Sequence, residues 1–151
     1  MTFSENDFQI LIRNDSKEIL GDITWEKDAN HEGSLIFVTE IQSDINYPIY
    51  LKGTFNSKRG TLSFSMIHRE VGRIYGLDMG QNHKNRATGK KTGRIHKHKW
   101  TDLYQDQDTY VPSDITKPYN DVIGVWNEFC LESKITHKGR MLGLPDNNYF
   151  N

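Results

Sequence analysis

The sequence lacks the residues on which several common kinds of site depend. Cysteine occurs once, as Cys130, so the chain has neither an internal disulfide nor a thiolate zinc site. So little cysteine is typical of a protein of the reducing cytoplasm. Neither a P-loop nor the glycine pattern of a dinucleotide-binding fold occurs. These absences exclude the commonest nucleotide-binding motifs.

Long apolar runs are also missing. No stretch approaches the about 18 apolar residues that a membrane-spanning helix requires, so we expect no membrane partner. The first residues, MTFSENDFQIL, contain neither the basic nor the apolar region of a signal peptide. We therefore expect a cytoplasmic protein.

The length and the aromatic content predict one folded domain over residues 1–151. The chain has 151 residues, and its seven Phe, seven Tyr and three Trp supply enough apolar surface for a core. Strand patterns dominate the middle of the chain and helical patterns lie at its ends. This arrangement predicts an α+β fold, an antiparallel sheet of about five or six strands with a short N-terminal helix and a C-terminal amphipathic helix.

The clearest strand lies over residues 62–66, where Leu62, Phe64 and Met66 alternate with Ser63 and Ser65. This alternation is typical of a strand with one buried face. Further strands are expected at residues 20–26, 34–42, 49–55, 71–78 and 93–100, and a long polar connection is expected over residues 102–118.

Two helices are expected at the ends of the chain. Ser4 with Asp7 three residues later has the pattern of a capping box that begins a helix. Near the other end, apolar residues recur at helical spacing and predict a helix that covers the sheet: Tyr119, Val122, Ile123, Trp126, Phe129 and Cys130.

Charge is distributed unevenly along the chain. The net charge is −1, yet residues 58–99 contain eleven Lys and Arg against two acidic residues. The remainder contains eight Lys and Arg against eighteen acidic residues. A basic segment within an acidic chain predicts a phosphate-rich partner, RNA or a phosphate-containing nucleotide.

The most basic part, HKNRATGKKTGRIHKHKW at residues 83–100, contains three of the six histidines and no acidic residue. On a strand, side chains at alternate positions share a face, so His96 and His98 would lie side by side. His83 belongs to the preceding loop, and Asp78 ends the preceding strand. We therefore expect one site that combines these residues.

The first interpretation of this site is metal-independent cleavage of a phosphodiester, which requires no cofactor. His96 and His98 would act as general base and general acid, His83 would assist, and Asp78 would orient an imidazole. Cationic side chains would hold the phosphate and stabilise the transition state. The expected ligand-binding residues are Arg94, Lys91, Lys90, Asn85, Arg86 and Trp100, the last by stacking on a base.

Two further interpretations stay open. His83, His96 and His98 are acceptable zinc ligands, although the surrounding cations oppose a divalent ion. Alternatively, the segment binds nucleic acid or a protein without catalysis. Calcium is not expected, because Asp102, Asp106 and Asp108 lack the glycine and glutamate of a calcium loop.

Part of this segment resembles a known pattern. LDMGQNHKN at residues 77–85, Gly89 and HKHKW at residues 96–100 are similar to a family of small bacterial and prophage-encoded proteins, a domain of unknown function. Members carry Leu-Asp-x-Gly, then His-x-Asn, a loop with a glycine, and His-x-His before an aromatic residue. The resemblance covers residues 50–135.

The resemblance implies five site residues in this sequence: Asp78, His83, Asn85, His96 and His98. Arg86 and Ala87 stand where the family tends to have proline and an acidic or small residue. The frequent setting of such proteins on mobile elements implies a toxin, defence or counter-defence role, with a protein partner from a host or antitoxin system.

Overall fold

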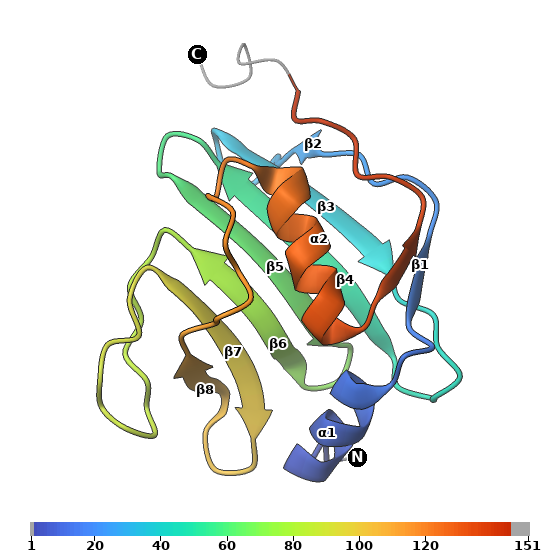
Figure 1. Ribbon diagram of the computed structural model, residues 1–151, viewed down its shortest axis with the longest axis vertical. Helices are drawn as coiled ribbons and strands as arrows, with labels where there is room; N and C mark the ends of the chain where they lie inside the picture. Colours follow the sequence, from blue (N-terminus) through green and yellow to red (C-terminus); the bar gives the residue numbers. More distant parts are fainter. Residues whose placement is uncertain (1, 146–151) are drawn as a thin grey trace.

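The protein is built around an antiparallel sheet that follows the order of the chain. The computed structural model describes residues 2–145. Seven strands form the sheet: β2 (Glu26–Lys27), β3 (Ser34–Glu40), β4 (Ile49–Asn56), β5 (Thr61–His68), β6 (Gly72–Met79), β7 (Ile95–Thr101) and β8 (Gln105–Tyr110). Sequential neighbours pair throughout, so the sheet is a meander, as Figure 1 shows.

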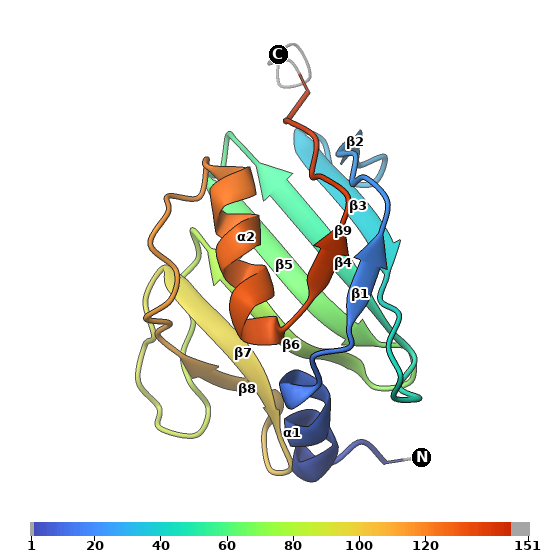
Figure 2. The same ribbon diagram turned by 45° about the vertical axis from the view of Figure 1, so that its right-hand side comes forward.

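The remaining elements lie on one side of this sheet (Figure 2). They are α1 (Glu5–Arg13), α2 (Val122–Ser133) and a two-stranded parallel ribbon of β1 (Glu18–Leu20) and β9 (Thr136–Lys138). The α+β prediction, with its N-terminal and C-terminal helices, is confirmed. Within residues 2–145, neither helix has the length and apolar character needed to cross a bilayer.

The covered face of the sheet forms the core because apolar side chains alternate along its strands. Leu62, Phe64 and Met66 are fully buried, and Ser63 and Ser65 alternate with them on the opposite face. Aromatic rings fill the space between this face and α2. The rings of Trp126 and Phe129 lie 5.1 and 5.5 Å from that of Phe64, centre to centre.

Local signals define the start and the end of α1. Ser4 and Asp7 form the expected capping box, in which each side chain accepts from the backbone N–H of the other residue. At the C-terminal end, the ammonium of Lys17 donates to carbonyl oxygens around the last turn, including that of Leu11 at 2.6 Å. Burial of this ammonium lowers the pKa of Lys17 to about 8.

Two expectations for the strands were wrong. Residues 20–26 do not form one strand: β1 ends at Leu20, Gly21 has a φ of 88°, and β2 begins at Glu26. The polar connection expected over residues 102–118 contains β8. This strand pairs with β7 at the edge of the sheet, where polar side chains remain partly solvated and no apolar alternation is needed.

The other face of the sheet is polar, and we call it the open face. The cross-strand register places Thr54 beside Ser63, Ser63 beside Asp78, and Asp78 beside His96, in one row across four strands. The next row runs through Lys52, Ser65, Gly76 and His98. Asp78, His96 and His98 are therefore gathered by register on the face opposite α2.

The buried aromatic cluster gives a direct test of the core. Phe64→Ala or Trp126→Ala should each lower the free energy of unfolding by about 3–5 kcal/mol, because each leaves a large cavity. Leu131→Ala on the same helix is the control, since that side chain is 78% exposed. Urea unfolding measures all three, and wild-type midpoints for both aromatic variants would contradict this assignment of the core.

Candidate functional site

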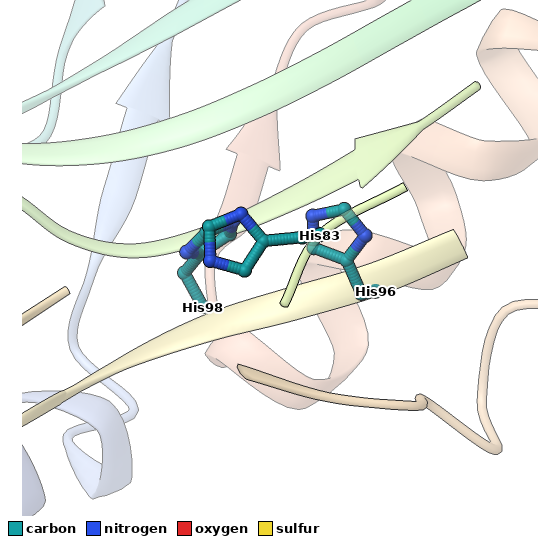
Figure 3. A group of neighbouring side chains, drawn as sticks. All are labelled: His83, His96 and His98. Atoms are coloured by element: carbon teal, nitrogen blue, oxygen red, sulfur yellow. The ribbon is translucent and has the colours of Figure 1, made fainter. Parts of the chain in front are cut away.

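The three histidines of the basic segment meet on the open face. His96 and His98 project from the same side of β7, because alternate residues of a strand share a face. His83 returns from the loop of residues 80–94, which joins β6 to β7. Figure 3 shows the three imidazole rings gathered beside β7. Their centres lie 4.8–5.3 Å apart.

The carboxylate of Asp78 lies next to two of these rings. Its Oδ2 is 3.0 Å from Nε2 of His98 and 3.5 Å from Nε2 of His96. On its other side, Asp78 accepts a 2.8 Å hydrogen bond from Ser63 Oγ. It also accepts hydrogen bonds of 3.3 Å from the guanidinium of Arg73. Burial alone raises the pKa of Asp78, but the contacts with His96, His98 and Arg73 outweigh it and hold the pKa well below its usual range.

The other nitrogen of each paired ring contacts a backbone carbonyl. Nδ1 of His96 lies 3.0 Å from the carbonyl oxygen of Gly93, and Nδ1 of His98 lies 2.6 Å from that of Asp106. A carbonyl oxygen only accepts, so each Nδ1 carries the hydrogen. In a neutral ring, Nε2 then carries a free lone pair, and both Nε2 atoms lie within 3.5 Å of Asp78 Oδ2.

The backbone of His83, which carries the third ring, is held by its own loop. The carbonyl of His83 accepts from both the backbone N–H and the hydroxyl of Thr92, at 2.8 and 3.1 Å. Nε2 of His83 is buried and forms no hydrogen bond with a described residue. The same holds for Nε2 of His98, whose approach to Asp78 lacks hydrogen-bond geometry. Burial, and then the neighbouring rings, lower the pKa of His83.

Arg73 crosses the open face above a glycine. A Cβ at Gly76 would lie 3.2 Å from Cδ of Arg73 and 3.0 Å from the carbonyl oxygen of Phe64. The absence of a side chain at Gly76 lets Arg73 reach both Asp78 and Asp106, with Nε 3.2 Å from Oδ2 of Asp106. A single guanidinium thus joins the carboxylate beside the histidines to the edge strand β8.

Asn85 fixes the loop of residues 80–94 to β8. Its side chain is buried and donates to the carbonyl oxygen of Thr109 and to Asp108, while its Oδ1 accepts from the N–H of Ala87 at 2.7 Å. Gly89 donates its N–H to the carbonyl of Asn85. The role of Asn85 visible here is to position the loop that carries His83.

The predicted residues fall into three groups. The structure brings together Asp78, His83, His96 and His98, with Asn85 holding the loop beside them. The predicted cations Arg86, Lys90, Lys91 and Arg94 are exposed on that loop. Trp100 lies apart: it is buried, it packs on Phe3 and its Nε1 donates to the carbonyl oxygen of Phe3.

Sequence reasoning missed Ser63, Arg73 and Asp106. Ser63 could have been found from its cross-strand pairing with Asp78, but only once the register was known. Arg73 of β6 pairs with Ile67 of β5, just past a register shift between Met66 and Ile67. This shift breaks the simple alternation of faces along β6. Asp106 contributes through a backbone carbonyl as well as its side chain, and no residue pattern signals such a contact.

This arrangement defines an α+β protein with a partly buried cluster of three imidazoles and one carboxylate on the open face of a meander. The chain belongs to a family of unknown function, DUF6978, whose model matches residues 3–135. The match begins well before residue 50, where the resemblance noted from the sequence began. No curated protein and no solved structure matches the chain.

The attachment of the loop at Asn85 can be tested by proteolysis. Asn85→Ala removes the side-chain hydrogen bonds and should weaken the closed loop by about 1–3 kcal/mol, or about 5- to 150-fold in its opening equilibrium. Trypsin should then cleave faster within residues 84–94, which contain five Lys and Arg. Asn82→Ala is the control, since Asn82 is exposed and outside these hydrogen bonds. Equal cleavage of wild type and Asn85→Ala would show that Asn85 does not hold the loop.

Proposed function

We propose that this protein binds a divalent transition-metal ion, with zinc as the preferred candidate. The ligands would be Nε2 of His83, His96 and His98, with Asp78 as the fourth. The observation that carries the proposal is the convergence of the three imidazole rings. Their candidate ligand atoms all lie within 4.8 Å of one another, which puts them within about 2.8 Å of a common centre. A zinc–imidazole bond is about 2.0–2.1 Å long, so small rotations of the rings would complete the site.

The hydrogen bonds of the paired rings support the same proposal. Imidazoles that bind metals typically donate their second N–H to a backbone carbonyl or a carboxylate, which fixes the ring and its tautomer. His96 and His98 have such carbonyl contacts through Nδ1. The lone pair of a neutral Nε2 this close to a carboxylate repels it unless a proton or a cation lies between them. A divalent ion would satisfy all four groups at once.

The charge around the site is less unfavourable than the sequence indicated. Lys97 lies on the opposite face of β7, where it pairs with Asp114 and Glu132. The Nζ of Lys99 lies over the ring of Tyr110. The charge of Arg73, which contacts Asp78, is shared with Asp106. Three neutral imidazoles and one carboxylate are a suitable donor set for zinc, and also for iron(II).

Metal-independent phosphodiester cleavage by His96 and His98 receives less support from this geometry. Both side chains are at most 2% exposed, and each Nδ1 is held by a carbonyl. A general acid or base must come within hydrogen-bond reach of its substrate. That role stays a prediction, and cleavage of RNA that survives EDTA would favour it over the metal site.

The exposed cations of the loop favour a second function, binding of RNA or a nucleotide phosphate. Among residues 2–145, none of five basic residues of this loop forms an ion pair: Lys84, Arg86, Lys90, Lys91 and Arg94. Unpaired cations gathered on one loop attract phosphates and release counterions on binding.

The metal proposal predicts about one zinc ion bound per chain when the purified protein is loaded and dialysed. His96→Ala, His98→Ala and His83→Ala should each weaken zinc affinity more than about 100-fold, a larger loss than the 10- to 100-fold effect of removing an outer-shell contact. His31→Ala is the matched control, because that side chain is 71% exposed and distant from the cluster in the sequence.

Metal analysis and cobalt(II) absorption spectra measure these effects without any assay of activity. Asp78→Asn should also weaken binding, because the amide supplies no negative charge. Wild-type zinc content in the three histidine variants would refute the proposed ligands. Cobalt spectra typical of an octahedral oxygen site would do so as well.

The RNA proposal predicts an affinity for single-stranded RNA that falls steeply with salt. Exchange of Lys90, Lys91 and Arg94 for Glu should abolish binding at low salt. The matched control exchanges three exposed cations elsewhere, Lys27, Lys117 and Arg140, for Glu. Fluorescence anisotropy at several salt concentrations measures both. Equal losses in the two triple variants would indicate a nonspecific effect of net charge.

A further inference from the structure

The open face carries a second feature beside the histidines, a cavity of about 260 Å³. Its floor is formed by two cross-strand pairs of β4 and β5, Thr54 with Ser63 and Asn56 with Thr61. Its walls come from the connections that precede β3, join β4 to β5 and follow β6. Three connections far apart in the sequence thus surround one polar floor.

The lining of this cavity is rich in unused hydrogen-bond donors. The hydroxyls of Thr54 and Thr61 form no hydrogen bond with a described residue. Lys52 and Arg59 also line the cavity, and neither forms an ion pair within residues 2–145. Ser34 accepts from the Asn56 amide at 3.1 Å, which leaves its own hydroxyl hydrogen free to donate.

One acidic residue lines the cavity, and its oxygens are engaged elsewhere. Oδ1 of Asp28 accepts from the N–H of Asn30 at 2.9 Å, and Oδ2 lies 3.1 Å from Nδ1 of His31. These contacts lower the pKa of Asp28, the hydrogen bond from Asn30 first. The hydroxyls of Thr54 and Thr61 and the charges of Lys52 and Arg59 therefore have no partner among residues 2–145, and an anion would supply one.

We propose that this cavity binds a small phosphate ester, with Lys52 and Arg59 contacting the phosphate and Thr54 and Thr61 donating to its oxygens. A volume of about 260 Å³ lies below the about 300–1,000 Å³ of pockets for drug-sized ligands. It accommodates a phosphate and a sugar, but not an oligonucleotide. Two cations and free hydroxyls favour a phosphate over a singly charged carboxylate.

The cavity adjoins the histidine cluster through one side chain. Ser63 lines the cavity and donates its hydroxyl hydrogen to Asp78. The phosphate ester would therefore be bound on the carboxylate side of the proposed metal centre. This inference shares with the proposed function only the idea of a phosphate-containing ligand. It does not depend on the metal, since Lys52 and Arg59 need no metal to bind a phosphate.

The experiment compares ribose 5-phosphate with ribose and with inorganic phosphate, titrated into the zinc-loaded protein by calorimetry. We expect ribose 5-phosphate to bind, inorganic phosphate to compete with it, and ribose not to bind. Lys52→Ala and Arg59→Ala should each weaken the binding about tenfold or more, the usual effect of losing a hydrogen bond to a charged group. Lys58→Ala is the matched control, because this exposed lysine is in the same turn as Arg59 but outside the cavity lining.

The outcomes separate this inference from the proposed metal site, because zinc content is measured on every variant. Binding that Lys52→Ala and Arg59→Ala leave unchanged, equal binding of ribose, or no binding of ribose 5-phosphate would overturn the cavity proposal even if zinc is bound. Binding that depends on Lys52 and Arg59 in a protein without affinity for zinc would retain the cavity and reject the metal centre.

Discussion

The carboxylate of Asp78 is the group on which the whole open-face site depends. It contacts His96, His98, Arg73 and Ser63, which come from three different strands. A buried carboxylate is stable only when its charge is compensated, and here both cationic and neutral donors surround it. Without this negative charge, the guanidinium of Arg73 and the hydroxyl of Ser63 would lose their shared acceptor beside the histidines. The same charge is what makes a divalent ion acceptable among three histidines.

The two faces of β7 serve different purposes. On the covered face, the ammonium of Lys97 is fully buried and pairs with Asp114 and Glu132. Tyr75 also donates to Glu132, at 2.6 Å. Burial of the Glu132 carboxylate favours its neutral form, yet these donors outweigh it and lower the pKa of Glu132. This network holds β7 from the covered face. The histidines on the open face therefore project from a strand that has little freedom to rotate.

The sequence was most informative where one short-range period decides the structure. Alternation predicted the central strands and put His96 beside His98, and helical spacing predicted α2. The alternation of apolar residues did not predict β8, whose edge position tolerates a polar sequence. Alternation also could not identify Arg73 as a site residue. Its side chain reaches Asp78 only because of a register shift and because Gly76, between them, has no side chain. These features arise from pairing between strands, which no local pattern encodes.

The parallel ribbon of β1 and β9 has a consequence for how the chain acquires its fold. Glu18 pairs with Thr136, and the N–H of Arg140 donates to Asp22 across 118 residues of sequence. The meander needs only neighbouring hairpins and can form as the chain emerges during synthesis, whereas the ribbon must wait for the last part of the chain. Contacts of such long sequence separation slow folding, because a large loop must close before they form. The pairing of β1 with β9 therefore forms only after residues 136–138 are synthesised, whereas Glu18 can already bridge to Gln42 at the start of the meander.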